Sequence, residues 1–331
     1  MIDVARLAGV SPMTVSRAFK QDGSVSDKTR TSVMEAADQL GYVFDSTAST
    51  LRSQRTGFVA VTIPSINNAN FADTVRGLSE GLKPYGLQIL LGTTDYDTAK
   101  EEELIEQLLR RRPEAIVVTG GKHTERARRL LENAGIPVVE TWDLPQDPIG
   151  HVVGFSNAAA VGDLVDHLVE TGRRRIAFIG GDTDRDTRGA DRRLGFIAAM
   201  QRHGLPTDRL IAAGPPPISM REGANAMAHL LAERPDTEAV ICVSDLSAFG
   251  ALTECERRGI PVPGRLAIAG FGDYEIAGIC VPSLTTVDPR PADIGRKAAE
   301  AILEAREAGP AGPRLSLPIG TQLRLRQSTA R

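Results

Sequence analysis

Residues 9–19 have the sequence GVSPMTVSRAF, which indicates how the N-terminal part of the chain folds. The Ser11 hydroxyl can accept a hydrogen bond from the first turn of a helix, and Pro12 suits the first helical position because it has no N–H to leave unpaired. Val15 and Phe19 are four residues apart, so they share one face that can be buried. The stretch therefore predicts a short helix that exposes Pro12, Met13, Ser16 and Arg17. Such a helix is either an ordinary surface helix or one that enters a groove.

Two further short helices flank this one. The segment IDVARLA precedes it and ends at Gly9. A third helix begins after the cap Ser26, repeats apolar residues at helical spacing, and ends at Gly41. Because a turn of only a few residues joins the first two helices, residues 1–43 have the layout of a helix-turn-helix. The alternative is a small helical cap on a larger domain.

Residues 44–56 form a different kind of segment. The stretch DSTASTLRSQRT is rich in serine and threonine, which is typical of a linker. Ala48 and Leu51 are three residues apart, which allows one or two helical turns. Because so short a helix is not stable alone, we expect it to form only against a partner surface.

From Phe58 onward, short apolar runs rich in β-branched residues alternate with helical patterns. The runs FVAVTIP, LQILLG, AIVVTGG, IPVVE and HVVGF come first, and RIAFIGG, LIAAG, EAVICVS and LAIAGFGD follow a break near residues 155–157. This alternation predicts parallel sheets buried on both faces, and about ten strands favour two α/β lobes over one open sheet. The segment LTTVDPRPADIGRKAAEAILEARE is predicted to be a helix, and RLSLPIGTQLRLRQS to form two last strands.

The composition of the 331 residues, with 41% apolar and 24% charged residues, is that of an ordinary globular chain. No run of about 20 apolar residues and no secretory signal is present, so no membrane partner is predicted. The three cysteines form no CxxC pair, which favours a reducing cytoplasm. Since the net charge is −3, any DNA binding must depend on a few well-placed groups.

Motifs of enzymes and cofactor sites are missing from the sequence. There is no GxGxxG, P-loop, GxSxG or HExxH motif. Residues 180–189, GGDTDRDTRG, hold several carboxylates without the spacing of a calcium loop. We therefore predict that the chain is not an enzyme and that it has no catalytic residue, metal or cofactor.

These residues resemble the LacI/GalR (lactose-repressor) family of transcriptional regulators. The pattern DVA-x-x-AGVS-x-x-TVSR, followed by VS-x-x-TR and LGY, matches the family's DNA-binding headpiece. The stretches RRLGF, SDLSAFGAL, AIAGFGD and PSLTTV match landmarks of its effector domain, so the resemblance covers essentially the whole chain. It implies a small all-α helix-turn-helix headpiece (1–43), a hinge helix (44–56) and an α/β effector domain (57–331) of two Rossmann-like lobes, like a type I periplasmic binding protein.

The resemblance also implies how the chain passes between the lobes and assembles. Crossings are expected near Ser156, near Val287–Pro289 and near Gly309–Gly312. The first lobe would then comprise residues 57–156 and 289–311, and the second lobe residues 157–287 and 312–331. Two such chains would form a homodimer that reads a pseudo-palindromic operator in double-stranded DNA.

The family's DNA-contacting positions can be carried onto this sequence. Arg17 would pair with a guanine edge, worth about 1–3 kcal/mol of discrimination, while Pro12 and Met13 would read shape or a thymine methyl. Leu51 matches a leucine that relatives insert into the minor groove, and insertion kinks the duplex. The serine and threonine hydroxyls would hold phosphates. The implied DNA-binding residues are Ser11, Pro12, Met13, Thr14, Ser16, Arg17, Ala48, Leu51 and Arg52. Many relatives carry Pro-Asn before the hinge helix, where this chain has Phe44 and Asp45.

Within the family, IPSINNANFADTVRGL, TGGKHT, IPVVETWDLP and VVGFSN are most similar to the gluconate-repressor branch. The ligand would lie between the lobes, at the carboxyl ends of the strands. The implied effector-binding residues are Asn68, Phe71, His123, Trp142, Arg188, Arg192, Ser244, Asp245 and Gly272. Core packing of Trp142 and a solvent-facing Arg188 remain open alternatives.

We expect the small-molecule effector to be a sugar acid such as gluconate. The planar guanidinium groups of Arg188 and Arg192 match a carboxylate, and Gly272 replaces an aspartate of many sugar-binding relatives that would repel an anion. Acidic side chains are expected at the rim of the site: Glu140, Asp143 and Asp245. The predicted function is a ligand-controlled repressor of sugar-acid catabolism genes. The alternative is a sugar-binding or sugar-converting α/β protein with a vestigial headpiece.

Overall fold

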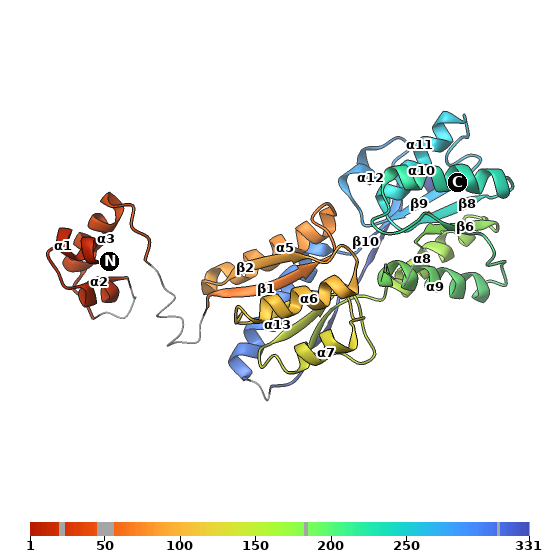
Figure 1. The fold of residues 1–331 in the computed structure, drawn as a ribbon. Helices are drawn as coiled ribbons and strands as arrows, with labels where there is room; N and C mark the ends of the chain where they lie inside the picture. Colours follow the sequence, from red (N-terminus) through yellow and green to blue (C-terminus); the bar gives the residue numbers. More distant parts are fainter. Residues whose placement is uncertain (20–23, 45–55, 182–184, 310–311, 331) are drawn as a thin grey trace. The chain divides into compact units, whose positions relative to one another are not determined.

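The structure is a computed structural model that describes residues 1–19, 24–44, 56–181, 185–309 and 312–330. Its contacts divide the chain into two compact units, residues 1–56 and 57–331 (Figure 1). The predicted hinge residues Ala48, Leu51 and Arg52 lie outside the described residues.

The first unit contains three helices: α1 (Ile2–Leu7), α2 (Pro12–Ala18) and α3 (Asp27–Gln39). All three contact one another around a small core in which Val4, Val15 and Val33 are fully buried. The Ser11 hydroxyl accepts a hydrogen bond from the Thr14 N–H at 3.1 Å, and Ser26 caps α3 in the same way. Arg30 on α3 donates to the Ala18 carbonyl and so fixes the end of α2. The predicted helix-turn-helix layout is confirmed.

The first lobe of the second unit is built on a sheet with the strand order β11-β5-β4-β3-β1-β2, and every neighbouring pair is parallel. Its strands are β1 (Phe58–Ile63), β2 (Gln88–Thr93), β3 (Ile116–Thr119), β4 (Val138–Thr141), β5 (His151–Gly154) and β11 (Ser316–Pro318). Two pairs of helices cover the sheet: α5 (Ala69–Leu82) with α13 (Pro291–Ala308), and α6 (Thr98–Leu109) with α7 (Glu125–Glu132). Their buried side chains belong to two separate apolar clusters, so both faces are covered as predicted (Figure 1). A 3-10 turn, η1 (Lys83–Tyr85), precedes β2.

The second lobe repeats this architecture with the strand order β12-β10-β9-β8-β6-β7. Its strands are β6 (Ile176–Gly180), β7 (Leu210–Ala212), β8 (Ala239–Cys242), β9 (Ala267–Phe271), β10 (Thr285–Asp288) and β12 (Gln322–Arg324). Its helices are α8 (Asn157–Glu170), α9 (Thr187–Arg202), α10 (Met220–Glu233), α11 (Asp245–Arg257) and α12 (Glu275–Ile279), with η2 (Gln327–Thr329) near the end. All pairs are parallel except β12, which runs antiparallel to β10.

Two of the expected lobe crossings lie where they were predicted, between β5 and α8 and between β10 and α13. The third does not. Gly309 only ends α13, with a φ of 72°, and the chain stays in the first lobe to form β11, which pairs with β5. The crossing therefore lies between Pro318 and Gln322, so residues 312–318 belong to the first lobe.

The helix predicted for LTTVDPRPADIGRKAAEAILEARE begins earlier than the observed helix α13. Residues 285–288 of LTTVDPRPADIG form strand β10, and the helix starts only at Pro291. Thr285, Thr286 and Val287 are buried in the sheet, which explains why a short run of β-branched residues forms a strand there. In the part of the chain that the structure describes, no helix has the length and apolar composition needed to cross a membrane.

Candidate functional site

A cavity of about 250 Å³ lies between the two lobes at the carboxyl ends of their strands. The first lobe contributes Asn68, Asn70, Phe71, Tyr96 and Trp142 to its wall. The second lobe contributes Asp186, Arg188, Arg192, Ser244, Phe271 and Tyr274. The charged residues of the wall are Arg188, Arg192 and Asp186, so among the described residues the wall carries two cations and one carboxyl group.

Trp142 forms part of both the cavity wall and the core. It follows β4 in a left-handed conformation with a φ of 70°, and its ring lies 5.2 Å from that of Phe71. Its Nε1 donates to the Thr74 hydroxyl at 3.2 Å, and its carbonyl accepts from the Asn157 amide at 3.0 Å. The ring thus presents an apolar surface to a ligand while its polar atom is satisfied within the protein.

The Arg192 guanidinium is held by contacts on several sides. Its Nε donates to Asn157 Oδ1 at 2.9 Å, and one Nη donates to the Val243 carbonyl at 2.8 Å. Its central carbon lies 3.6 Å from the centre of the Phe271 ring, a cation–π contact. Burial lowers the pKa of Arg192 to about 10, which still leaves it protonated at neutral pH.

Arg188 reaches the same cavity from the first turn of α9 with fewer contacts. Only 6% of the residue is exposed. One Nη donates to the Thr119 carbonyl at 3.4 Å, the long limit of a hydrogen bond, and the guanidinium lies 5.6 Å from the Phe71 ring. The alternative of a solvent-facing Arg188 is therefore wrong.

A hydrogen bond crosses the cavity between the lobes. The Tyr274 hydroxyl, from the second lobe, donates to Asn68 Oδ1 in the first lobe at 2.7 Å. Gly272 makes this possible because it adopts a φ of +130°, and a Cβ at this position would lie 2.6 Å from the Tyr274 ring. Gly272 therefore serves the packing of Tyr274, a reason that the sequence did not reveal.

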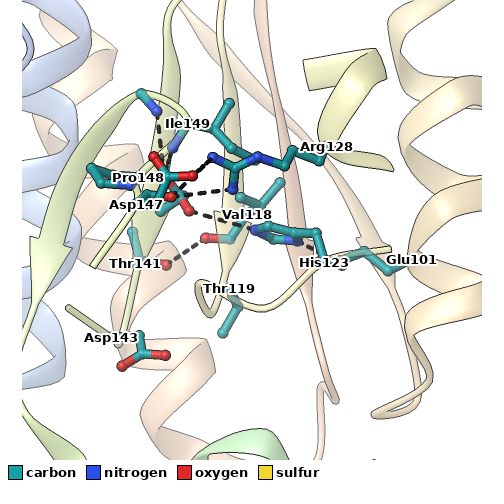
Figure 2. Close-up of polar contacts among 12 residues, drawn as sticks. Glu101, Val118, Thr119, His123, Arg128, Thr141, Asp143, Asp147, Pro148 and Ile149 are labelled. Carbon is teal, nitrogen blue, oxygen red and sulfur yellow. Dashed lines mark hydrogen bonds and ion pairs between the residues drawn. The ribbon is translucent and has the colours of Figure 1, made fainter. Parts of the chain in front are cut away.

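His123 does not line this cavity, contrary to the prediction. Its side chain is 1% exposed and lies inside the first lobe, with Nδ1 2.8 Å from Glu101 Oε2 (Figure 2) and Nε2 3.7 Å from Glu140 Oε1. Burial by itself would lower the pKa of His123, but the two carboxyl groups outweigh it and raise the pKa to about 9. Glu140 is likewise not at the rim, because it is fully buried and its Oε2 accepts from the Ile149 N–H at 2.6 Å.

Two other acidic residues expected near the ligand also have different positions. Asp245 is fully buried, where its carboxyl group accepts from the Thr286 hydroxyl at 2.6 Å and from the Tyr274 N–H at 2.8 Å. Burial raises the pKa of Asp245 to about 6. Asp143 is half-buried outside the cavity wall, and its carboxyl group accepts from the Leu144 N–H at 2.9 Å.

Two ion pairs join the lobes beside the cavity. Arg185 pairs with Asp97 at 2.7 Å, and Lys122 pairs with Asp191 at 2.8 Å. Lys122 directly precedes His123, and Asp97 caps the helix that carries Glu101. Among the described residues, no group of three or more His, Cys, Asp and Glu side chains is arranged to hold a metal ion.

Comparison with known proteins identifies the chain. A family model described as bacterial regulatory proteins, lacI family, matches residues 1–45, and one described as a periplasmic binding protein-like domain matches residues 165–329. The HTH-type transcriptional regulator GntR of Pseudomonas aeruginosa is 39% identical over 328 residues, which are 99% of this chain and 94% of that protein. The chain belongs to the LacI family of bacterial regulatory proteins. It is a DNA-binding transcriptional regulator.

Solved structures of LacI-family proteins share its fold. A LacI-family transcriptional regulator from Silicibacter pomeroyi is similar with a TM-score of 0.93 and 33% identity, covering 100% of this chain and 99% of that one. The lac repressor dimer bound to operator and the anti-inducer ONPF has a TM-score of 0.85 at 22% identity, covering 99% and 98%. The predicted fold class is confirmed.

The headpiece of this LacI-family protein presents the predicted DNA-contacting residues along α2. Pro12, Met13 and Arg17 are exposed, and Met13 is 64% exposed despite its apolar side chain. Met13 and Arg17 are four residues apart and so share one face of the helix. Ser16 and Thr14 are half-buried, and the Ser11 hydroxyl oxygen accepts the capping bond from the Thr14 N–H.

Sequence reasoning missed several residues of the cavity wall. They are Ser65, Asn70, Tyr96, Asp186, Ile218, Ser219, Phe271 and Tyr274. Tyr96 follows β2 and Tyr274 follows β9, so the rule that placed Asn68 and Trp142 at strand ends would also have indicated these two tyrosines.

Proposed function

We propose that this LacI-family regulator is a repressor whose DNA binding is controlled by a small sugar acid. The observation that carries the proposal is the cavity wall, in which two arginines outnumber the single carboxyl group among the described residues. Arginine matches a carboxylate in shape and charge. The cavity volume of about 250 Å³ suits a ligand of monosaccharide size, because pockets for drug-sized ligands begin at roughly 300 Å³.

The uncharged part of the wall supports a polyhydroxylated ligand. Asn68, Asn70, Tyr96, Ser244 and Tyr274 supply amide and hydroxyl groups that can both donate and accept hydrogen bonds. Phe71, Trp142 and Phe271 supply flat apolar faces beside them. The similarity of IPSINNANFADTVRGL and IPVVETWDLP to the gluconate-repressor branch points to gluconate or a close relative.

Control of DNA binding follows from the position of the cavity between the lobes. A ligand that contacts both lobes has different affinities for different lobe arrangements, and this difference shifts their populations. A preference of about 10⁴-fold would shift the population from 1:99 to 99:1. The ion pairs Lys122–Asp191 and Arg185–Asp97 lie across the same boundary, so they would change with the arrangement.

The repressor would act in the cytoplasm as a homodimer on a pseudo-palindromic operator. In the second lobe Ile279, Val281 and Leu325 are exposed, and Val281 is 87% exposed. Leu325 lines a surface hollow together with Gly278 and Ser283, which lie next to Ile279 and near Val281 in the sequence. Exposed apolar side chains that lie close together are typical of a protein–protein contact, and a second copy of this chain is the partner that we propose.

The test combines ligand titration with a DNA-binding assay. We expect isothermal titration to detect binding of gluconate, 6-phosphogluconate or 2-ketogluconate but not of glucose or ribose. In a gel-shift assay with DNA from upstream of its own gene, we expect the bound acid to change operator affinity and Arg17→Ala to abolish specific binding. Tight binding of a neutral sugar without any response to an acid would contradict the sugar-acid proposal, and an unchanged gel shift with Arg17→Ala would contradict the role of α2.

A further inference from the structure

The two arginines of the cavity differ in how much of each guanidinium the protein already engages. Arg192 makes two hydrogen bonds of 2.9 and 2.8 Å and lies against the Phe271 ring at 3.6 Å. Both bonds run to groups of the second lobe, Asn157 and Val243. These contacts fix the orientation of Arg192 and occupy two of its three nitrogens before any ligand arrives.

Arg188 is as deeply placed but much less engaged. Within the described parts of the chain its guanidinium has one hydrogen bond, of 3.4 Å, and no ion pair. Among the described residues, no neighbouring carboxyl group forms an ion pair with Arg188: Asp186 accepts from the Gly189 N–H at 3.0 Å, and Asp191 pairs with Lys122. Asp143, the other acid that faces this region, accepts from the Leu144 N–H.

A buried cation without a compensating partner is unfavourable, because water no longer solvates it. Arg188 faces a cavity, so an anion bound there can supply the missing partner. Its planar fork with free N–H groups matches the two oxygens of a carboxylate. Arg192 has fewer free N–H groups for such a fork, since its Nε and one Nη already donate to the protein.

We propose that Arg188 is the residue that selects an anionic ligand, whereas Arg192 contacts charged and neutral ligands alike. This inference rests on the proposed sugar-acid function and assigns the charge recognition of that site to one side chain. It replaces the expectation from sequence that both arginines recognise the acid.

The test compares gluconate with gluconamide, which keeps the hydroxyl chain but replaces the carboxylate with a neutral amide. The measured quantity is the ratio of the two dissociation constants in isothermal titration. Because a hydrogen bond to a charged group is worth about 1.5–3 kcal/mol, wild type is expected to prefer gluconate by on the order of 10- to 100-fold. Arg188→Gln should reduce this ratio to near one by weakening gluconate alone.

Three further variants sharpen the assignment. Arg192→Gln should weaken both ligands together and leave their ratio high. Arg185→Gln should leave the ratio unchanged, because Arg185 pairs with Asp97 outside the cavity wall, and the loss of this pair between the lobes acts on both ligands alike. Arg188→Lys should keep part of the preference, since it retains the charge without the fork.

Each outcome has a distinct meaning. A ratio that stays high in Arg188→Gln, or that falls to one in Arg192→Gln instead, overturns the assignment while the sugar-acid function stands. If wild type binds gluconate and gluconamide equally well, the assignment is also overturned, because no charge selection then exists to assign. If wild type binds no sugar acid at all, the proposed function itself fails.

Discussion

His123 and Arg188 are two deeply buried basic side chains of one domain in opposite surroundings. The imidazole of His123 lies 2.8 Å from Glu101 (Figure 2) and, on its other side, 3.7 Å from Glu140. Arg188 faces a cavity and has no ion pair with any residue that the structure describes. Both follow strand ends where a ligand contact is expected, yet only one of them faces a ligand site.

The difference shows what distinguishes a structural cation from a binding one. Where the chain supplies the opposite charge, the buried group links elements of the fold: His123 connects α6, the β3–α7 loop and β4. Where the chain leaves a cavity instead, the opposite charge must come from outside. Burial alone therefore does not mark a ligand residue; burial next to a cavity with few partners does.

The largest expected effect comes from removing the partner of His123. Glu101→Gln keeps the shape of the side chain but removes its charge, and breaking a buried pair typically costs about 3–5 kcal/mol. We expect the free energy of unfolding at pH 7 to fall by about 3 kcal/mol. Urea denaturation followed by fluorescence of Trp142, the sole tryptophan, reports on this domain.

A matched control separates burial from charge. Asp95→Asn removes the acid of an ion pair of the same 2.8 Å length, with Lys100, but this pair is exposed. Asparagine tolerates the left-handed backbone of residue 95, where φ is 52°. We expect no measurable change in the free energy of unfolding, since exposed ion pairs contribute little to stability. If both variants lost the same free energy of unfolding, the buried carboxyl group of Glu101 would contribute no more than an exposed one.

The pH dependence of His123 gives a second effect of similar size. Its pKa is about 9 in the folded state against an ordinary value of 6.5. A raised folded pKa means that the stability it contributes is fully present below pH 6.5 and is lost as the pH rises through 9. The shift corresponds to about 3 kcal/mol between these limits. We therefore expect the difference in unfolding free energy between wild type and His123→Gln to shrink from pH 6 to pH 10. A difference that stays constant over this range would contradict a raised pKa.

The sequence predicted the headpiece and most strands because their signals are local. Ser11 and Ser26 mark helix starts within three residues of their hydrogen-bond partners, and the apolar runs mark strands directly. The position of His123 was mispredicted because its partners are remote: Glu101 is 22 residues earlier and Glu140 lies on another strand. The position of the third lobe crossing was mispredicted for the same reason, since the pairing of β11 with β5 joins residues far apart in the sequence.

The same is true of the cavity: residues marked by a local signal were predicted, and contacts between residues distant in the sequence were not. Strand ends correctly indicated Asn68, Trp142 and Ser244, because the carboxyl ends of parallel strands meet at one edge. Which of two arginines keeps more free N–H groups could not be predicted. That depends on Asn157 and Val243, which reach Arg192 from 35 and 51 residues away.

The smallest change in the free energy of unfolding is expected when Arg188 is replaced in the absence of ligand. This variant tests the second half of the comparison, the cation that has no ion pair. If the protein leaves this cation uncompensated, replacing it with a neutral side chain should not destabilise the fold. We expect Arg188→Gln without ligand to leave the free energy of unfolding unchanged or to raise it by up to about 1 kcal/mol, as is common when a binding residue is neutralised. The measurement is the same Trp142 denaturation that reports on Glu101→Gln. Gluconate at 100 times its Kd should then stabilise wild type by about 2.7 kcal/mol, and at the same concentration it should stabilise the variant much less. A loss of about 2 kcal/mol or more without ligand, on the order of what breaking a buried polar contact costs, would mean that the fold itself compensates Arg188, and the contrast with His123 would disappear.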